Sequence, residues 1–209
     1  MKTLEQKLSE GRQYRTVVEL RIDESDEKIV EGYATTFNQP YELFRDAEYT
    51  FLEEVDSSAF DETDMSDVIM QYDHEGRVFA RTANGTLALN PDEHGLHIRA
   101  DLSGTELGRQ LYEEIKGGYT DKMSFGFTVA EDSREITEDH ETGAVTVLRK
   151  IVRIGKLYDV SAVSLPANNA TEISARSWSD GVIAELTEEH RKAEERERKK
   201  QKIRIMLDM

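Results

Sequence analysis

The stretch YTDKMSFGFTV, residues 119–129, places one serine in the middle of a mostly apolar segment. Apolar residues alternate here with small or polar ones, which is the two-residue period of a strand with one buried face. The apolar set is Met123, Phe125, Phe127 and Val129, and the small or polar set is Ser124, Gly126 and Thr128. On this strand alone, the simplest interpretation is that Ser124 fills the solvent side of a sheet.

The composition limits the class of protein. The chain has 209 residues, 37% of them hydrophobic, which is enough for one domain with a packed core and an appendage. Without cysteine, disulfides, thiolate metal sites and a cysteine nucleophile are excluded, and a reducing compartment is expected. No apolar run is long enough to span a membrane, and the N-terminal segment lacks the apolar core of a signal peptide. We therefore expect a globular protein that stays where it is made, without a membrane partner.

The charge is unevenly distributed. The formal net charge of -16 argues against a nucleic-acid partner, because such proteins replace phosphate counterions with Lys and Arg. Residues 185–209 hold seven acidic and eight basic side chains, a sum of +1, so residues 1–184 hold -17. Within this tail, TEEHRKAEERERKKQK has almost no apolar residues, which predicts a charged helix that is exposed, partner-bound or disordered when alone.

Short strands separated by turn residues fill most of the chain. Besides the opening stretch, the predicted strands are residues 14–22, 28–37, 68–72, 78–81, 86–89, 95–101, 145–154 and 156–165. Asn84-Gly85 predicts a hairpin. A capping box of Ser103 and Glu106 predicts the start of a helix that ends at Gly117 and delivers the chain to the Ser124 strand.

Turn residues and the change in composition also divide the chain. Pro166 and the polar residues that follow it break the strand pattern. We expect an N-terminal segment over residues 1–12, one folded domain over 13–171, and a linker with a charged helical tail over 172–209.

One histidine is a candidate partner for Ser124. A serine hydroxyl becomes a useful nucleophile only when a base takes its proton, and a third polar group usually orients that base. His74, in VIMQYDHEG, lies where an apolar strand meets a glycine, and rigid scaffolds often present catalytic side chains at such ends. Its neighbours Asp73 and Glu75 also allow an ordinary solvated histidine.

The other histidines have simpler interpretations. His94 and His97 have an HxxH spacing that could suggest a metal site, but no further ligands cluster with them, which favours a surface turn. His140 lies in a polar loop and His190 in the charged tail. We therefore expect no metal and no cofactor.

Four segments, in this order, resemble the tailed-phage prohead protease family. In that family a histidine precedes a GR…GTL.L stretch, a MSFGF strand carries the nucleophile, and a strand ending in EVS.V..PA follows. The matching segments are EGYATTFNQPY (31–41), YDHEGRVFARTANGTLALNPDEHGL (72–96), TELGRQLYEEIKGGYTDKMSFGFTV (105–129) and LYDVSAVSLPANNAT (157–171). The family is related to the herpesvirus maturational protease, which implies an α+β fold: a mainly antiparallel β-barrel with surrounding helices, here followed by the charged C-terminal helix.

Position by position, the resemblance implies that Ser124 is the nucleophile and His74 the base. It places Asp159 in the block that the family opens with an acidic residue, often Glu, and so implies that Asp159 orients the base. Glu138, Glu75 or a water molecule are the alternatives for this third role. Gly126 would leave room for a substrate backbone beside the hydroxyl. The oxyanion hole has no sequence signature, because backbone donors do not depend on residue type.

The resemblance also implies the reaction and its setting. It implies hydrolysis of peptide bonds in capsid-assembly proteins, inside the immature shell in the host cytoplasm. The expected partners are the major capsid protein with its scaffold segment, any separate scaffold protein, and a second copy of the chain in a homodimer. The charged tail is a candidate contact with the scaffold.

Other classes of protein stay open at this point. The first is a capsid scaffold or assembly chaperone that keeps the fold without activity, although both Ser124 and His74 are present in their motifs. The second is an esterase, but the chain lacks the GxSxG elbow. A metal-dependent enzyme is disfavoured for want of clustered ligands.

Overall fold

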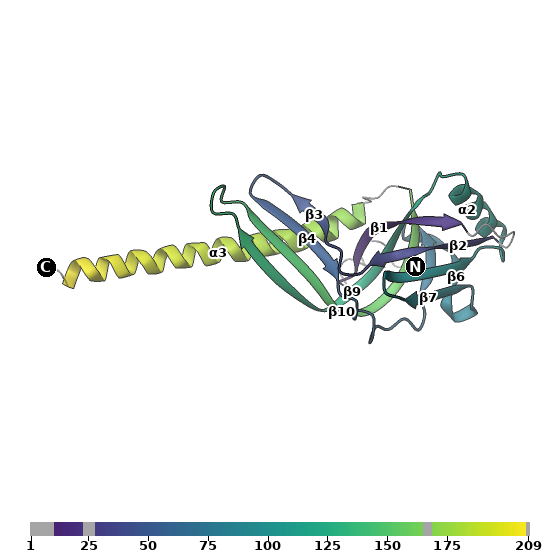
Figure 1. Ribbon diagram of the computed structural model, residues 1–209, viewed down its shortest axis with the longest axis horizontal. Coiled ribbons are helices and arrows are strands. Elements are labelled where there is room, and N and C mark those ends of the chain that lie inside the picture. The colour runs from purple at the N-terminus through teal and green to yellow at the C-terminus, as the bar shows by residue number, and fades with distance from the viewer. Residues whose placement is uncertain (1–10, 23–27, 165–168, 208–209) are drawn as a thin grey trace.

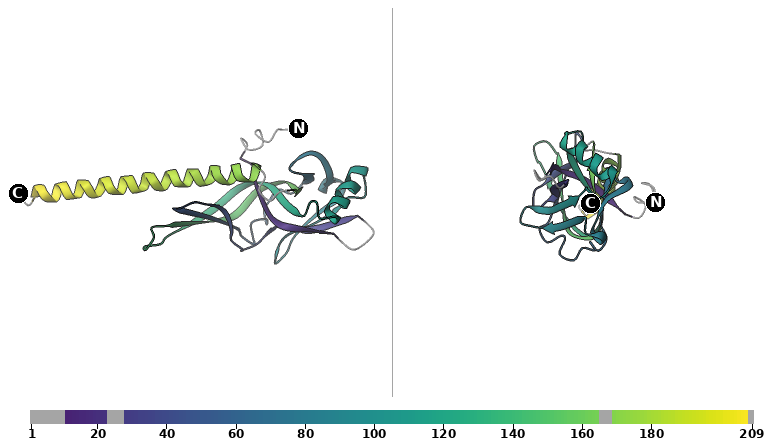
Figure 2. Two further views of the ribbon diagram at one scale, coloured as in Figure 1. Left: turned by 90° about the horizontal axis from the view of Figure 1, so that it is seen from above. Right: turned by 90° about the vertical axis from the view of Figure 1, so that its right-hand side faces the viewer.

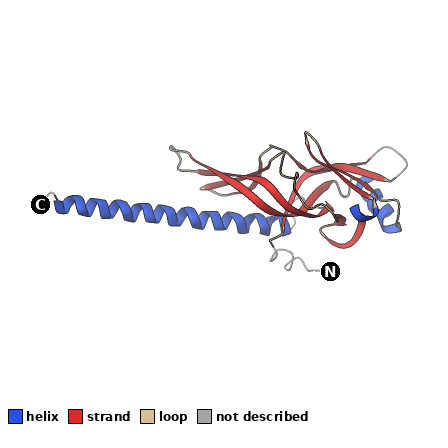
Figure 3. Ribbon diagram, turned by 90° about the horizontal axis from the view of Figure 1, so that it is seen from below, coloured by secondary structure: helices blue, strands red, loops and turns tan. Residues whose placement is uncertain are grey.

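A computed structural model describes residues 11–22, 28–164 and 169–207. Their strands are β1 (Gln13–Ile22), β2 (Ile29–Thr36), β3 (Tyr41–Arg45), β4 (Tyr49–Val55), β5 (Ile69–Tyr72), β6 (Glu75–Arg81), β7 (Leu87–Pro91), β8 (Gly95–Asp101), β9 (Lys122–Glu138) and β10 (Val145–Val163). Their helices are the 3-10 turn η1 (Thr82–Asn84) and the α-helices α2 (Glu106–Lys116) and α3 (Asn169–Leu207). The fold is therefore α+β and mostly strand, as expected (Figure 3).

Two long strands, β9 and β10, form the centre of the sheet (Figure 1). The strand order is β3-β4-β10-β9-β1-β2-β8-β7, and β5 pairs with β10 beside this path and carries β6. β10 pairs in parallel with β4 through residues 145–151 and with β5 through residues 159–162. Register shifts along the β9–β10 ladder mark bulges, which bend the pair and increase its twist. The sheet can therefore surround one core at one end and support α3 at the other.

The expected closed barrel is not found among the described strands. Consecutive strands β6 and β7 would have to pair to close it, but β6 pairs with β5 and β7 with β8. The Asn84-Gly85 signal makes a turn between them rather than the expected hairpin, with Gly85 at φ +75°. The Thr86 hydroxyl accepts the Arg81 N–H at 2.9 Å where the ladder would begin, so side-chain bonding replaces strand pairing at this point.

The main core lies between the inner strands and α2. Met123, Phe125 and Phe127 of β9 are fully buried in it, so the predicted apolar face of this strand is confirmed. Helix α2 adds Leu111 and Ile115 to the same core. Its N-cap is Thr105, whose hydroxyl accepts the Gly108 N–H at 2.9 Å, and not the predicted Ser103. The helix nevertheless delivers the chain to β9 as expected.

Helix α3 packs against the sheet only through its first half and then projects away from it (Figures 1 and 2). Trp178 and Val182 belong to a second apolar cluster with Phe51 of β4 and Val147 of β10. All residues from 189 to 201 are exposed, as their charged sequence predicts. Among the described residues, no helix combines the length and the apolarity that a membrane span requires.

The predicted boundary between the folded domain and the tail lies at the start of α3. This helix begins at Asn169, so residue 171, the predicted end of the domain, falls within its first turn. Residues 1–10, and Pro166 with its neighbours 165–168, lie outside the described residues. The division into segments 1–12, 13–171 and 172–209 therefore stays a prediction.

Candidate active site

His74 is held by a tight hairpin between β5 and β6. Tyr72 pairs with Glu75, which leaves Asp73 and His74 as a two-residue loop, with φ values of +46° and +60°. Positive φ at both positions is typical of a type I′ hairpin turn and is strained for residues other than glycine, so the surrounding contacts must hold it. The Asp73 N–H donates to the Ala162 carbonyl at 2.9 Å, which fixes the turn to the end of β10.

The structure brings the three predicted site residues into one chain of contacts. His74 Nε2 lies 2.6 Å from Ser124 Oγ, and His74 Nδ1 makes a short hydrogen bond with Asp159 Oδ1. The Ser161 hydroxyl donates to the same Asp159 oxygen at 3.0 Å. With Asp159 accepting at Nδ1–H, Nε2 is free to accept the serine proton, which is the arrangement that activates a serine.

The other acids considered for the third position lie elsewhere. Glu75 follows His74 in the chain and Glu138 lies at the end of β9, and both are exposed. Asp159 instead is 1% exposed, beside a histidine that is fully buried. A buried carboxylate needs a hydrogen-bonding partner, and His74 supplies it.

Strand register explains why Ser124 and Asp159 share a site. In the β9–β10 ladder, Ser161 is opposite Ser124 and Asp159 is opposite Gly126, so all four lie on one face of the sheet. Ser124 is fully buried on this face. The interpretation of Ser124 as a solvent-facing filler is therefore wrong, because the β5–β6 turn covers this face with His74.

Because Gly126 has no side chain, the Asp159 carboxylate can occupy the space beside it. A Cβ at this position would lie 2.4 Å from Asp159 Oδ2 and 2.8 Å from Cε1 of Tyr14. Both separations are far below van der Waals contact, so a larger residue here would displace Asp159 and Tyr14. The expectation that Gly126 leaves room for a substrate backbone is wrong in this respect, since Asp159 and Tyr14 fill that room.

Tyr14 is a neighbour of the site that sequence reasoning missed. Its ring centroid lies 4.4 Å from that of His74, and the residue is fully buried. Burial and the adjacent Asp159 charge raise the pKa of the Tyr14 hydroxyl, which keeps the phenol neutral. Tyr14 is the β1 partner of Gly126, a relation between distant positions that no local pattern could have indicated.

The remaining histidines do not join the site. His94 and His97 pack against the ring of Tyr33, with centroid separations of 4.6 and 5.2 Å. The Asp92 carboxylate accepts the His94 N–H at 2.7 Å, as in an ordinary turn. No group of three or more metal-ligating side chains occurs among the described residues.

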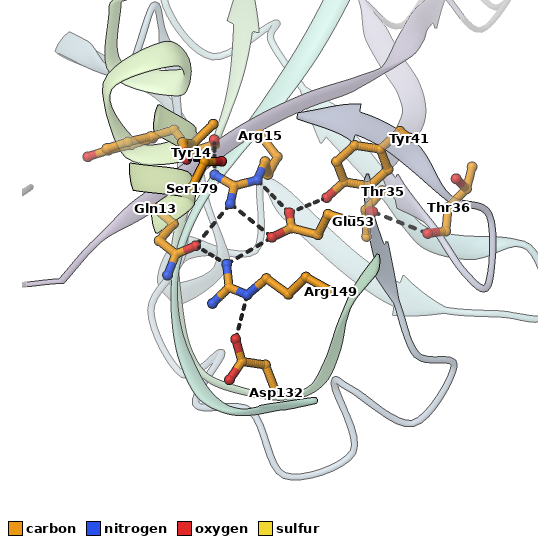
Figure 4. Close-up of polar contacts among 11 residues, drawn as sticks. Gln13, Tyr14, Arg15, Thr35, Thr36, Tyr41, Glu53, Asp132, Arg149 and Ser179 are labelled. Carbon is orange, nitrogen blue, oxygen red and sulfur yellow. Dashed lines mark hydrogen bonds and ion pairs between the residues drawn. The ribbon is translucent and has the colours of Figure 1, made fainter. Parts of the chain in front are cut away.

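A second buried polar group, which we term the arginine cluster, lies under the first turns of α3 (Figure 4). Arg15 donates two hydrogen bonds to Glu53, and Arg149 donates a third at 2.9 Å. The cluster consists of the buried Arg15, Glu53 and Arg149, the partly buried Gln13 and Tyr41, and the more exposed Asp132. Burial by itself would raise the pKa of the Glu53 carboxyl, but the two arginines more than offset this and hold that pKa below its ordinary value.

A hydroxyl, an imidazole and a carboxylate linked in this order, in a buried site on a mostly β fold, define the class of serine hydrolases. A comparison with family models then identifies the particular family. The chain belongs to the caudovirus prohead serine proteases, whose model matches residues 16–182, and it is therefore a serine endopeptidase. Neither the comparison with curated proteins nor that with solved structures gives a match. The relation to the herpesvirus protease stays a prediction.

Proposed function

We propose that this chain is the maturation endopeptidase of a phage prohead, with Ser124 as nucleophile, His74 as general base and Asp159 as the acid that orients it. The observation that supports this assignment is the 2.6 Å contact between Ser124 Oγ and His74 Nε2, made within the residues that match the family. The separation lies within the range expected between a nucleophile and its base.

The reaction follows from these contacts. Ser124 Oγ attacks the carbonyl carbon of the peptide bond while its proton passes to His74 Nε2. The intermediate collapses as the C–N bond breaks and His74 gives that proton to the leaving amine. Water then attacks the acyl-enzyme, with His74 again as base, and releases the acid and the free serine. Asp159 stays ionised and stabilises the imidazolium in both halves of the reaction.

The site as described is closed. Ser124 and His74 are 0% exposed and Asp159 is 1% exposed, so a peptide carbonyl reaches the hydroxyl only after a rearrangement. A protease that is carried into an assembling shell must not cleave its partners early, and a closed site serves this need. We propose that the site opens only transiently in the free chain, and that assembly inside the prohead favours the open state.

The proposed substrates are the scaffold segment of the major capsid protein and the protease itself, and the proposed assembly is a homodimer. The proposed contact with the scaffold is the exposed half of α3, in which residues 189–201 are all exposed and mostly charged. Deleting this half should abolish packaging into the shell and leave the folding of the domain intact.

The test is intact mass over time for the purified chain and for Ser124→Ala, each alone and with the cognate capsid protein. Discrete fragments with the parent chain, absent with Ser124→Ala, would support the proposal and locate the cleaved bonds. If both chains and the capsid protein stay whole, the proposal fails and the inactive scaffold protein becomes the better interpretation.

A further inference from the structure

We propose that Thr16 is a catalytic residue whose hydroxyl donates a hydrogen bond to the oxyanion formed when Ser124 attacks a substrate carbonyl. The inference rests on the proposed function and adds to it a group of the oxyanion hole. Such a donor stabilises the negative charge that develops on the carbonyl oxygen, and it acts beside the nucleophile.

The register of the sheet places Thr16 beside Ser124. In the β1–β9 ladder, Thr16 is the direct partner of Ser124, as Tyr14 is of Gly126. Direct partners in an antiparallel pair lie on the same face, with Cβ atoms about 4.5–5.5 Å apart. The contact between the Tyr14 and His74 rings shows that this face of β1 is the one that meets the catalytic histidine. The Thr16 side chain therefore stands next to Ser124, on the site's own face of the sheet.

The Thr16 hydroxyl is also unpaired within the described part of the chain. Its Oγ1 is buried and has no hydrogen-bond partner among the described residues. Other threonines inside the fold are paired: the Thr35 hydroxyl donates to the Thr36 carbonyl at 3.2 Å, and the Thr63 hydroxyl to the Ile154 carbonyl at 2.9 Å. A buried hydroxyl without a partner destabilises the fold, so its presence beside a nucleophile calls for an explanation in the chemistry.

The backbone at Thr16 is also unusual. The register of the β1–β9 ladder shifts between Thr16 and Val18, so β1 has a bulge directly next to the partner of Ser124. Bulges are common beside active sites, where they redirect a side chain. Here the bulge follows the residue whose hydroxyl faces the site.

An oxyanion donor is most effective when it makes no other hydrogen bond before the reaction, and the Thr16 hydroxyl meets this condition among the described residues. During the attack the Thr16 hydroxyl keeps its proton and donates it in a hydrogen bond, while the Ser124 proton goes to His74. Because Thr16 Oγ1 has no partner among the described residues to give up, the new bond stabilises the transition state more than the resting site. Loss of this hydroxyl should therefore lower kcat with little effect on KM.

The test uses the full chain and a fluorescent fluorophosphonate, in which the Ser124 oxygen displaces fluoride from phosphorus and negative charge develops on the phosphoryl oxygen. The rate of labelling is measured for the parent, Thr16→Val and Thr16→Ser. Thr16→Val keeps the shape without the hydroxyl and should react on the order of 10²–10³-fold more slowly, whereas Thr16→Ser should stay within about tenfold of the parent. The same ratios are expected for kcat in cleavage of the capsid protein.

Melting temperatures and a control variant distinguish a loss of catalysis from a loss of folding. Thr16→Val should have an unchanged or higher melting temperature, because it removes an unpaired buried hydroxyl. Thr35→Val removes a paired hydroxyl outside the site, so it should melt lower and react at the parent rate. Equal rates for the parent and Thr16→Val overturn the inference and leave the proposed function standing. A parent chain that is neither labelled at Ser124 nor active on the capsid protein overturns both.

Discussion

The same three strands, β1, β9 and β10, carry two buried polar groups that differ in how completely their atoms are paired. In the arginine cluster, no buried side-chain atom lacks a partner among the described residues. In the proposed catalytic group, which consists of Ser124, His74, Asp159 and Thr16, the atoms Asp159 Oδ2 and Thr16 Oγ1 are buried without a partner among the described residues. A fully paired network makes a fold rigid and specific, whereas a buried unpaired group destabilises the fold and calls for an explanation, of which a part in catalysis is one.

The two groups also differ in what they join. The arginine cluster connects Arg15 of β1 to Glu53 of β4 and Arg149 of β10, and Arg149 lies 4.7 Å from the ring of Trp178 in α3. It therefore holds the outer strands and the helix to the sheet. The proposed catalytic group depends on a strained turn at His74 and on neighbouring strands of the sheet. Substitutions in one group should affect stability, and substitutions in the other should affect catalysis.

The largest effect is expected from His74→Asn. Asparagine tolerates the positive φ of this turn, so the fold should be kept, while the base is lost. Proteolysis should fall on the order of 10⁴-fold or more, by analogy with other triads. The rate of cleavage of the capsid protein measures the loss, and urea unfolding checks the fold. An active His74→Asn would remove His74 from the mechanism.

The next effect is expected in the arginine cluster, from Glu53→Ala. This change leaves Arg15 and Arg149 buried without their shared carboxylate, which should lower the free energy of unfolding by about 3–5 kcal/mol. Urea titration measures it. The chain that remains folded should still be labelled by a fluorophosphonate. Parent-like stability would show that the paired network is not structural, and the comparison between the two groups would then fail.

Gly126→Ala tests how closely the carboxylate is held. The added methyl group would meet Asp159 Oδ2 at 2.4 Å, so the carboxylate must shift from the position in which it holds His74. A displacement of this size should lower kcat by about 10²-fold. Gly155→Ala is the matched control, because its Cβ would meet neighbours only at 3.5 Å or more and should leave kcat unchanged. Equal rates for the two variants would contradict the assigned role of Asp159.

A smaller effect is expected on the free energy of unfolding at low pH. The pKa of Glu53 is lower in the folded chain than its ordinary value of 4.5, so its contribution to stability is present above pH 4.5 and is lost as the pH falls through the folded-state pKa. The free energy of unfolding of the parent should therefore decline more steeply in this range than that of Glu53→Gln. Urea titrations at several pH values measure the difference between the two chains. Parallel curves would contradict the prediction.

The smallest effect is expected from the exposed half of α3. Among the described side chains, removing residues 191–209 breaks only exposed ion pairs such as Arg191–Glu188, so the free energy of unfolding should change by less than about 0.5 kcal/mol. Trp178→Ala, in the packed half, is the contrast: it removes contacts with Phe51 and Arg149 and should cost more than about 1 kcal/mol. A large loss from the truncation would mean that the exposed half supports the domain.

Much of the fold follows local patterns and is confirmed. The strands near residues 14–22, 28–37 and 95–101 lie close to their predicted places, because alternation and turn residues act over a few positions. The sequence pattern does not indicate β4, because Glu53 faces inward to the arginine cluster and interrupts the alternation of apolar residues. It does not indicate β3 either, because none of the five residues of that strand is buried. The hairpin at Asn84 was wrong because side-chain bonding there replaces the ladder.

For the candidate site, the motifs in the sequence were enough to select Ser124, His74 and Asp159, since the resemblance ties each position to a role. They could not show that the small, polar face of β9 is buried, nor that Tyr14 and Thr16 lie opposite Gly126 and Ser124. A two-residue period determines which side chains share a face, but only the pairing of distant strands decides what covers that face. That pairing closes this site.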